Sequence, residues 1–195
     1  MEQELEIEFK NILTRQEYEQ LYTDFRQDKF TEFSQRNVYF DTPSLDLKNR
    51  GCALRIRLKE DDAELTLKTP FEGHHKELNL PLSLDDAHLM TIQGAFQIPE
   101  PVIEILEVEE PILNRSVIKL AELHTARLET MRDDALVVLD KSTYSGQVDY
   151  ELEVEAASEE TGLKVFKSIL EHYDIPKRKT ENKISRAFNA GKKRY

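Results

Sequence analysis

The chain has 195 residues, enough for one domain or two small ones, and 39% of them are hydrophobic, which is enough to build a core. Asp and Glu number 38 against 27 Lys and Arg, and the formal net charge of −11 argues against a nucleic-acid-binding surface. No apolar run reaches membrane-spanning length and the N-terminus is acidic from residue 2, so we expect neither a membrane segment nor a signal peptide. The single cysteine, Cys52, rules out an internal disulfide and fits a reducing cytoplasm.

The first ten residues, MEQELEIEFK, alternate strictly between polar and apolar side chains. Such alternation predicts a strand with one face toward a core. The polar face carries a row of three carboxylates followed by a lysine: Glu4, Glu6, Glu8 and Lys10. Like charges this close repel each other, so we expect a cation or a basic partner opposite them.

A helix should follow over residues 15–27, because Thr14 and Glu17 have the spacing of a capping box and apolar residues recur with helical periodicity. Alternating patterns then predict further strands at residues 35–42, 52–60, 63–70 and 75–80. His74 and His75 are expected in a loop before the last of these strands.

In the middle of the chain, we expect a partly helical insertion at about residues 81–112. We expect one helix at 85–95, begun by Asp85 or Asp86, and a short one near 101–108, bracketed by prolines that include Pro111. Strand patterns return at residues 116–129, 135–142 and 147–156, followed by a helix at 159–173 and a basic tail in which residues 180–189 could be helical. That tail helix would place Lys179, Lys183 and Arg186 on one face.

About eight strands in hairpin order predict an antiparallel sheet in an α+β fold. An open sheet with a solvated charged face is one interpretation, and a closed eight-stranded barrel with helices packed outside is the other. The barrel is favoured because the apolar face needs covering by the amphipathic helices, and because the polar face is poor in Ser, Thr and Gln. Charged side chains would then line the inside of the barrel.

The charged strand faces combine two kinds of side chain. The carboxylates are Glu4, Glu6, Glu8, Glu77, Glu129, Asp140, Glu151 and Glu153; the bases are Lys10, Arg55, Arg57, Lys68 and Arg127, with Lys183 and Arg186 available from the tail. Carboxylates suit a hard divalent cation such as Mg²⁺ or Mn²⁺, and Arg and Lys suit phosphate oxygens. The combination predicts phosphoryl chemistry.

The sequence also resembles a known family. Glu6, Glu8 and Lys10 form an E-x-E-x-K motif that is similar to the N-terminal signature of the CYTH family, the triphosphate tunnel metalloenzymes. The matches continue in order along the chain with NVYFDT at 37–42, RIR at 55–57, LTLK at 65–68, Glu77, Arg127, Asp140, ELE at 151–153 and the Lys183 region. The resemblance covers essentially the whole chain as a single domain, 1–195, and points to the stand-alone bacterial (YjbK-like) members.

The resemblance implies an eight-stranded antiparallel tunnel that binds a triphosphate, with a C-terminal helix that plugs one end and carries Lys183. Glu6, Glu8, Glu151 and Glu153, with Asp140, would hold the metal. Phosphates would be bound by Lys10, Arg55, Arg57, Lys68, Arg127, Lys183 and Arg186. Catalytic roles fall to Asp140 and Glu77, which would orient water or hold a second metal, and to Lys183 near the leaving group.

Three functions stay open on the sequence. The first is a metal-dependent triphosphatase, with inorganic tripolyphosphate ahead of nucleoside or thiamine triphosphates as substrate. The second is a class IV adenylyl cyclase that forms cyclic AMP and pyrophosphate from ATP, and the third is a module that binds polyphosphate or a nucleotide without turnover. A homodimer is compatible with the sequence, and no nucleic-acid or membrane partner is expected.

Overall fold

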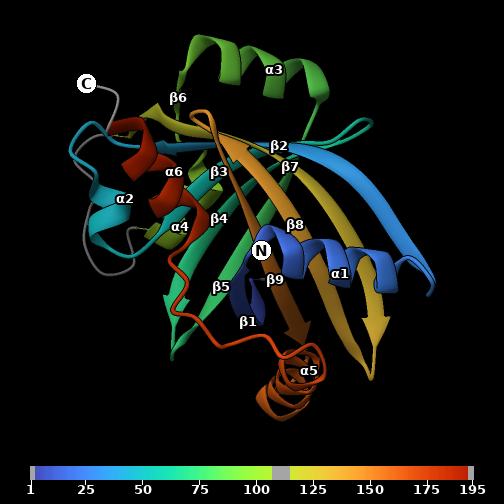
Figure 1. Cartoon of the computed structure of the whole chain (residues 1–195). Helices are drawn as coiled ribbons and strands as arrows, with labels where there is room; N and C mark the ends of the chain where they lie inside the picture. Colours follow the sequence, from blue (N-terminus) through green and yellow to red (C-terminus); the bar gives the residue numbers. More distant parts are fainter. Residues whose placement is uncertain (1–2, 107–114, 193–195) are drawn as a thin grey trace. The chain divides into compact units, whose positions relative to one another are not determined.

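The computed structural model describes residues 3–106 and 115–192. Its strands are β1 (Glu4–Leu13), β2 (Phe30–Asp41), β3 (Ala53–Leu58), β4 (Ala63–Phe71), β5 (His74–Leu82), β6 (Ala95–Gln97), β7 (Ser116–Arg132), β8 (Ala135–Tyr144) and β9 (Gln147–Ala156). Its helices are α1 (Arg15–Phe25), α2 (Asp46–Asn49), α3 (Leu84–Gln93), α4 (Glu100–Leu106), α5 (Glu159–His172) and α6 (Lys183–Lys192) (Figure 1). No helix in this described part of the chain has the length and hydrophobicity that crossing a bilayer requires.

The strands form one hydrogen-bonded sheet in the order β2–β3–β4–β5–β1–β9–β8–β7–β6. An additional pairing of β2 with β7 joins the two ends of the eight-strand series, so these eight strands close into an antiparallel barrel. The ninth strand, β6, pairs with β7 outside the barrel. The predicted closed barrel is therefore confirmed, and the open sheet is excluded.

The chain packs as two compact units. The first contains residues 1–5 and 36–122, and the second contains residues 6–35 and 123–195. Each unit has an apolar cluster on one face of its strands and a charged cluster on the other, as strand alternation requires. The expectation of a single domain stays a prediction.

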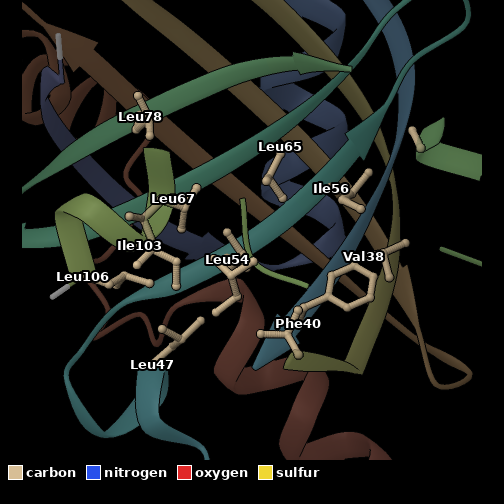
Figure 2. Close-up of a cluster of buried hydrophobic side chains, with 14 of the residues drawn as sticks. Val38, Phe40, Leu47, Leu54, Ile56, Leu65, Leu67, Leu78, Ile103 and Leu106 are labelled. Carbon is tan, nitrogen blue, oxygen red and sulfur yellow. The ribbon is translucent and has the colours of Figure 1, made fainter. Parts of the chain in front are cut away.

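The core of the first unit is made by alternate residues of β2–β5, among them Phe40, Leu54, Ile56 and Leu65 (Figure 2). Three helices cover it: α2 through Leu47, α3 through Ala87, and α4 through Val102, Ile103 and Leu106. The expected insertion at 81–112 thus begins within β5 and includes two helices that close this core. Its residues 107–112, with Pro111, lie outside the described residues.

The core of the second unit lies between strands β7–β9 and helices α1 and α5 (Figure 1). Helix α1 contributes Tyr18, Leu21 and Phe25, and helix α5 contributes Val165, Phe166, Ile169 and Leu170. The sequence predicted these two amphipathic helices as the cover of the apolar face. They cover Val137 and Leu139, but not Leu54 or Leu65 of the first unit's core, which has helices of its own.

Tight turns fix the hairpin registers. Both residues of each two-residue turn have positive φ: Glu72–Gly73, Asp133–Asp134 and Ser145–Gly146. Such turns match the twist of the strands they connect. They hold β4–β5, β7–β8 and β8–β9 in register, and register decides which charged side chains stand opposite one another.

Several element boundaries differ from the predicted ones. Helix α1 ends at Phe25, and β2 begins at Phe30, five residues before the predicted start of that strand, because residues 30–34 are extended without a polar–apolar alternation that could have indicated it. Ser83, rather than an aspartate, caps α3 by accepting a hydrogen bond from the Asp86 amide. His74 and His75 lie in β5 rather than in a loop, and β4 continues past Pro70 to Phe71.

Two short elements, α2 and β6, were not predicted. Helix α6 begins at Lys183, so Lys179 lies before the helix and not on its face.

Candidate active site

In the second unit, charged side chains stand in rows across β1, β9, β8 and β7. The register places Lys10 opposite Glu153, and Glu8 opposite Glu155. It also places Glu151 opposite Asp140, and Asp140 opposite Arg127. Because alternate residues point to one face, these groups share the face opposite the apolar core.

Arg127 is the buried cation of this cluster. Its guanidinium binds Asp140 in bidentate fashion, with Nε–Oδ1 and Nη2–Oδ2 distances of 2.8 and 2.7 Å. Nη2 also donates to Glu153 Oε2 at 2.9 Å, and Nη1 lies 3.6 Å from Glu129 Oε1. The planar fork of arginine permits one side chain to hold two carboxylates in fixed positions.

Helix α6 brings two more cations to the same strands. Lys183 Nζ lies 2.6 Å from Asp140 Oδ2 and 3.7 Å from Glu151 Oε1, and it donates a hydrogen bond to Glu153 Oε1. Arg186 donates through Nε to Asp149 Oδ2 at 2.8 Å and through Nη2 to Glu151. The two residues are three positions apart and so lie on one side of the helix.

The segment before α6, residues 176–180, is fastened to β1. The Arg178 backbone N–H donates to Asn11 Oδ1 at 2.6 Å, and the Asn11 amide donates to the Pro176 carbonyl at 3.1 Å. The Ile12 N–H donates to Thr180 Oγ1 at 2.9 Å. The start of α6 is thus positioned by backbone and side-chain bonds to the first strand.

Three carboxylates can approach a single cation. One oxygen each of Glu8, Glu151 and Glu153 lies within 4.8 Å of the other two, and we call these three residues the acidic cage. An all-oxygen, all-carboxylate donor set fits Mg²⁺ or Mn²⁺. Glu6, which was predicted with them, does not join this set among the described residues, and Asp140 instead binds Arg127 and Lys183.

Burial and neighbouring charges push the pKa values of this cluster apart. Burial alone would raise the pKa of Glu153, but Lys183 and Arg127 outweigh it and hold that pKa well below its usual range. Arg127 and Lys183 lower the pKa of Asp140 against the same effect of burial. Burial, joined by repulsion from Glu153, raises the pKa of Glu151 to about 7, and likewise that of Glu155.

The first unit carries a separate charged group, the basic cluster, which we define as Arg55, Arg57 and Lys68. Glu77 lies at its centre, with Oε1 3.2 Å from Lys68 Nζ and 3.6 Å from Arg55 Nη2. Arg57 Nη1 lies 3.1 Å from Glu64 Oε1, and its Nε donates to Asn37 Oδ1 at 3.2 Å. The register explains the grouping, because Lys68 pairs with Glu77, and Arg57 lies between Asn37 and Glu64.

Cations outnumber carboxylates in the basic cluster, three against Glu64 and Glu77. Burial would raise the pKa of Glu77, but Arg55 and Lys68 outweigh it and lower that pKa. Glu77 therefore remains ionised and holds two cations in place without neutralising the cluster. An excess of Arg and Lys donors on one strand face can bind the oxygens of a polyanion.

Apart from Glu6, the predicted site residues fall into two groups. Arg55, Arg57, Lys68 and Glu77 group in the first unit. In the second unit, one ionic network contains Arg127, Lys183, Arg186, Asp140, Glu151 and Glu153. Lys10 pairs with Glu8 at 3.0 Å, and Glu8 lies close to this network through Glu151 and Glu153. Glu4, the first carboxylate of the predicted row, is exposed.

The sequence reasoning missed other residues of the charged faces. Glu155 is only partly exposed and stands opposite Glu8 in the register of β1 and β9. Asp149 accepts hydrogen bonds from Arg186 and from the Tyr144 hydroxyl. Buried hydroxyls also occur on faces that were expected to lack them: Thr66 in the first unit, and in the second Thr125 and Ser142, whose oxygens lie 3.0 Å apart. Thr66 alternates with buried apolar residues in the sequence, and this alternation could have placed it on the charged face.

The strands of this closed antiparallel barrel carry both the acidic cage and the basic cluster. This combination defines a class of protein suited to bind metal ions and polyanions. The chain matches the CYTH domain over residues 4–188, and it belongs to that family. It is 36% identical over 193 residues to YjbK of Bacillus subtilis (strain 168), a candidate triphosphatase, with 99% of each chain covered. The predicted family, and its YjbK-like branch, are thereby confirmed.

Solved structures show the same fold. A candidate adenylate cyclase from Bacillus halodurans is 34% identical with a TM-score of 0.84, covering 96% of this chain and 100% of that one. HpAC1 from Hippeastrum, described as a candidate adenylyl cyclase with a dominant triphosphatase activity, has a TM-score of 0.75 at 20% identity, covering 97% of this chain and 96% of that one.

Proposed function

We propose that this protein is a divalent-metal-dependent hydrolase of triphosphate compounds, with inorganic tripolyphosphate as its leading substrate and pyrophosphate and phosphate as its products. The observation that carries the proposal is the presence of both the acidic cage and the basic cluster on strand faces of a CYTH barrel. The 36% identity to a candidate triphosphatase supports the same reaction class.

The acidic cage would hold Mg²⁺ or Mn²⁺ through Glu8, Glu151 and Glu153. A divalent cation bound there would neutralise phosphate charge and so make the phosphorus easier to attack. Family membership and the carboxylate donor set support this assignment. Glu6 lies two residues from Glu8 on the same strand face, and its role as a further ligand stays a prediction.

The basic cluster would bind phosphate oxygens through Arg55, Arg57 and Lys68. Arginine can bind two oxygens of one phosphate at once, and Glu77 keeps Arg55 and Lys68 in position for this. In the second unit, Asp140 positions Arg127 and Lys183 in the same way. We therefore propose Glu77 and Asp140 as positioning residues; that either orients the attacking water stays a prediction.

Phosphate release from tripolyphosphate in the presence of Mg²⁺ or Mn²⁺ tests the proposal. The wild-type protein should release phosphate only with the metal, and Glu8→Gln should lower kcat/KM by at least about 100-fold, the size of effect that follows loss of one charge-stabilising group. Glu4→Gln removes an exposed carboxylate from the same strand and should behave as wild type. Equal rates for wild type and Glu8→Gln would overturn the proposal.

Cyclic AMP synthesis is the second candidate, and the 34% identity to a candidate adenylate cyclase favours testing it. In a cyclase, the 3′-hydroxyl of ATP attacks the α-phosphorus and pyrophosphate leaves. Cyclic AMP formed with equal amounts of pyrophosphate would identify a cyclase. Release of phosphate from ATP or thiamine triphosphate without cyclic AMP would instead extend the hydrolase to those substrates. Tight metal-dependent binding without any product would identify a non-catalytic binding module.

A further inference from the structure

Lys183 contacts the very carboxylates that are suited to bind a metal ion. Its ammonium group hydrogen-bonds to Glu153 Oε1 and lies 3.7 Å from Glu151 Oε1, and both residues belong to the acidic cage. Arg186, one helical turn further along α6, donates to the other oxygen of Glu151. Two of the three cage residues therefore already have cationic partners from a single helix.

We propose that Lys183, assisted by Arg186, is a built-in counter-cation of the acidic cage, which a divalent metal ion must displace in order to bind. The inference rests on the proposed function in one respect, that the cage is the metal site. It adds that α6 competes with the metal and so sets how tightly the metal is held.

Charge and burial explain why a counter-cation is needed. Glu151 is 1% exposed and Glu153 is 5% exposed, and buried carboxylates close together are strongly unfavourable without a cation between them. An ammonium group and a divalent ion repel each other and cannot both contact the same oxygens. Lys183 therefore keeps the metal-free cage stable, and the same contacts weaken metal binding.

Displacement of Lys183 by a metal ion requires movement of the lysine side chain and not of helix α6. Residues 176–180 are fixed to β1 by the hydrogen bonds of Asn11, Ile12, Arg178 and Thr180. The start of α6 is therefore held, and rotation about the four-carbon stem of Lys183 would let the ammonium group leave the cage without moving the helix. Asp140, whose Oδ2 lies 2.6 Å from the ammonium group, can retain Lys183 after it leaves Glu151 and Glu153.

The experiment compares Mn²⁺ binding by wild type and Lys183→Met with titration calorimetry at pH 8, without substrate. Removing the competing cation should tighten Mn²⁺ binding by about tenfold, within the usual range for coupling between two ligands. Lys183→Arg keeps a cation at the position and should bind Mn²⁺ as wild type does. Lys179→Met removes an exposed charge just before α6 and should also leave the affinity unchanged.

Thermal unfolding provides a second measurement. Without metal, Lys183→Met should unfold at a lower temperature than wild type, and Mn²⁺ should raise its Tm by more than it raises that of wild type. If Lys183→Met is unfolded without metal, Arg186→Gln answers the same question, because it removes the other α6 cation from Glu151. Tighter Mn²⁺ binding by Arg186→Gln supports the proposed displacement, and unchanged or weaker binding overturns it.

Unchanged or weaker Mn²⁺ binding by folded Lys183→Met overturns the inference. If the wild-type protein nevertheless releases phosphate with Mn²⁺, the proposed function stands and the counter-cation role alone is wrong. If neither wild type nor Lys183→Met binds Mn²⁺ or releases phosphate, both are wrong. If only the variant binds Mn²⁺, the competition is stronger than expected and the inference is supported.

Discussion

The two charged clusters arise from the same strand alternation but differ in sign and in burial. The basic cluster has three cations against two carboxylates, and the side chains in its ion pairs are 14–25% exposed. In the second unit carboxylates are in excess, and Asp140 and Glu151 are 0% and 1% exposed. The first cluster is suited to an anionic ligand and the second to a cation.

The source of the cations also differs. Arg55, Arg57 and Lys68 all come from strands β3 and β4, so the sheet alone builds the basic cluster. The acidic cage has Lys10 and Arg127 as partners from the sheet, but it also contacts Lys183 and Arg186, which come from a helix outside the sheet. A cluster that depends on a separate element can be altered by moving or removing that element, and this makes the acidic cage the more adjustable of the two.

The largest expected effect on stability follows loss of Arg127. Arg127→Met leaves Asp140 and Glu153 buried with fewer cations, which should lower the free energy of unfolding by about 3–5 kcal/mol. Arg57→Met, the matched change in the basic cluster, should lower it by less than about 1 kcal/mol, because Glu64 is 25% exposed and can be hydrated. Urea unfolding at pH 7 measures both.

Adding Asp140→Asn to Arg127→Met should restore part of the lost stability, because it removes one of the two buried carboxylates that would otherwise share Lys183 as their remaining cation. Equal destabilisation by Arg127→Met and Arg57→Met would contradict the difference in burial between the two clusters.

Alternation made much of this arrangement predictable. The charged faces of β1, β3, β4 and β9 follow directly from the polar–apolar order in the sequence, as does the Thr14–Glu17 capping box that begins α1. No sequence pattern indicates closure of the barrel directly. We inferred closure from the amount of apolar surface that the helices had to cover. The family resemblance supplied the order of the motifs along the chain.

The sequence could not predict which side chains meet, because contacts depend on register and on tertiary packing. Bidentate binding of Asp140 by Arg127 needs the β7–β8 register, which the Asp133–Asp134 turn fixes through positive φ values that aspartate adopts only occasionally. Helix α2 has four residues and β6 has three, too few for a periodic pattern. The partial burial of Glu155 likewise depends on its neighbours across the sheet.

The largest expected effect on activity within the basic cluster follows Arg57→Met. Loss of a guanidinium that binds phosphate oxygens should lower kcat/KM for tripolyphosphate by about 100-fold, while the protein stays folded. Arg57→Lys should recover only part of the activity, because lysine cannot bind two oxygens in the same planar geometry. Initial rates of phosphate release measure both variants.

Arg36→Met is the matched control, because Arg36 binds Glu122 outside the basic cluster. A similar loss of activity in Arg36→Met would indicate a general structural effect and would remove the special role of Arg57.

A smaller effect should follow loss of Arg178, which helps to hold the segment that precedes α6. Arg178 binds Glu17 through both guanidinium Nη atoms, at 2.8 and 2.7 Å, and it also donates to the Ile12 carbonyl at 3.1 Å. Arg178→Ala should lower the free energy of unfolding by about 1–2 kcal/mol. It should also speed hydrogen exchange of the α6 amides and leave the β3–β4 amides unchanged.

Arg15→Ala breaks a more exposed ion pair, with Glu19 on α1, and should leave the free energy of unfolding nearly unchanged because water screens the pair. If hydrogen exchange in α6 is the same in Arg178→Ala and Arg15→Ala, Arg178 does not hold the helix.

A further small effect is expected outside both clusters, at Glu122. Hydrogen bonding to Arg36, opposed by burial and aided by Lys119, lowers the pKa of Glu122 to about 2. A carboxyl group with a lowered pKa in the folded state stabilises that state above its unfolded pKa of about 4.5, and this stabilisation is lost as the pH falls toward 2. Because the Glu122 side chain is 25% exposed, water screens the interaction to about 1 kcal/mol at pH 7.

Glu122→Gln should therefore be less stable than wild type by about 1 kcal/mol at pH 7, and the difference should shrink between pH 4.5 and pH 3. Urea unfolding at pH 7, 4 and 3 measures this, with the exposed Glu60→Gln as the variant that should show no such trend. A difference that grows as the pH falls would mean that Glu122 is not held ionised by Arg36. A difference as large as that of Arg127→Met would mean that partial exposure does not weaken ion pairs here, and would remove the physical basis for separating the two charged clusters by burial.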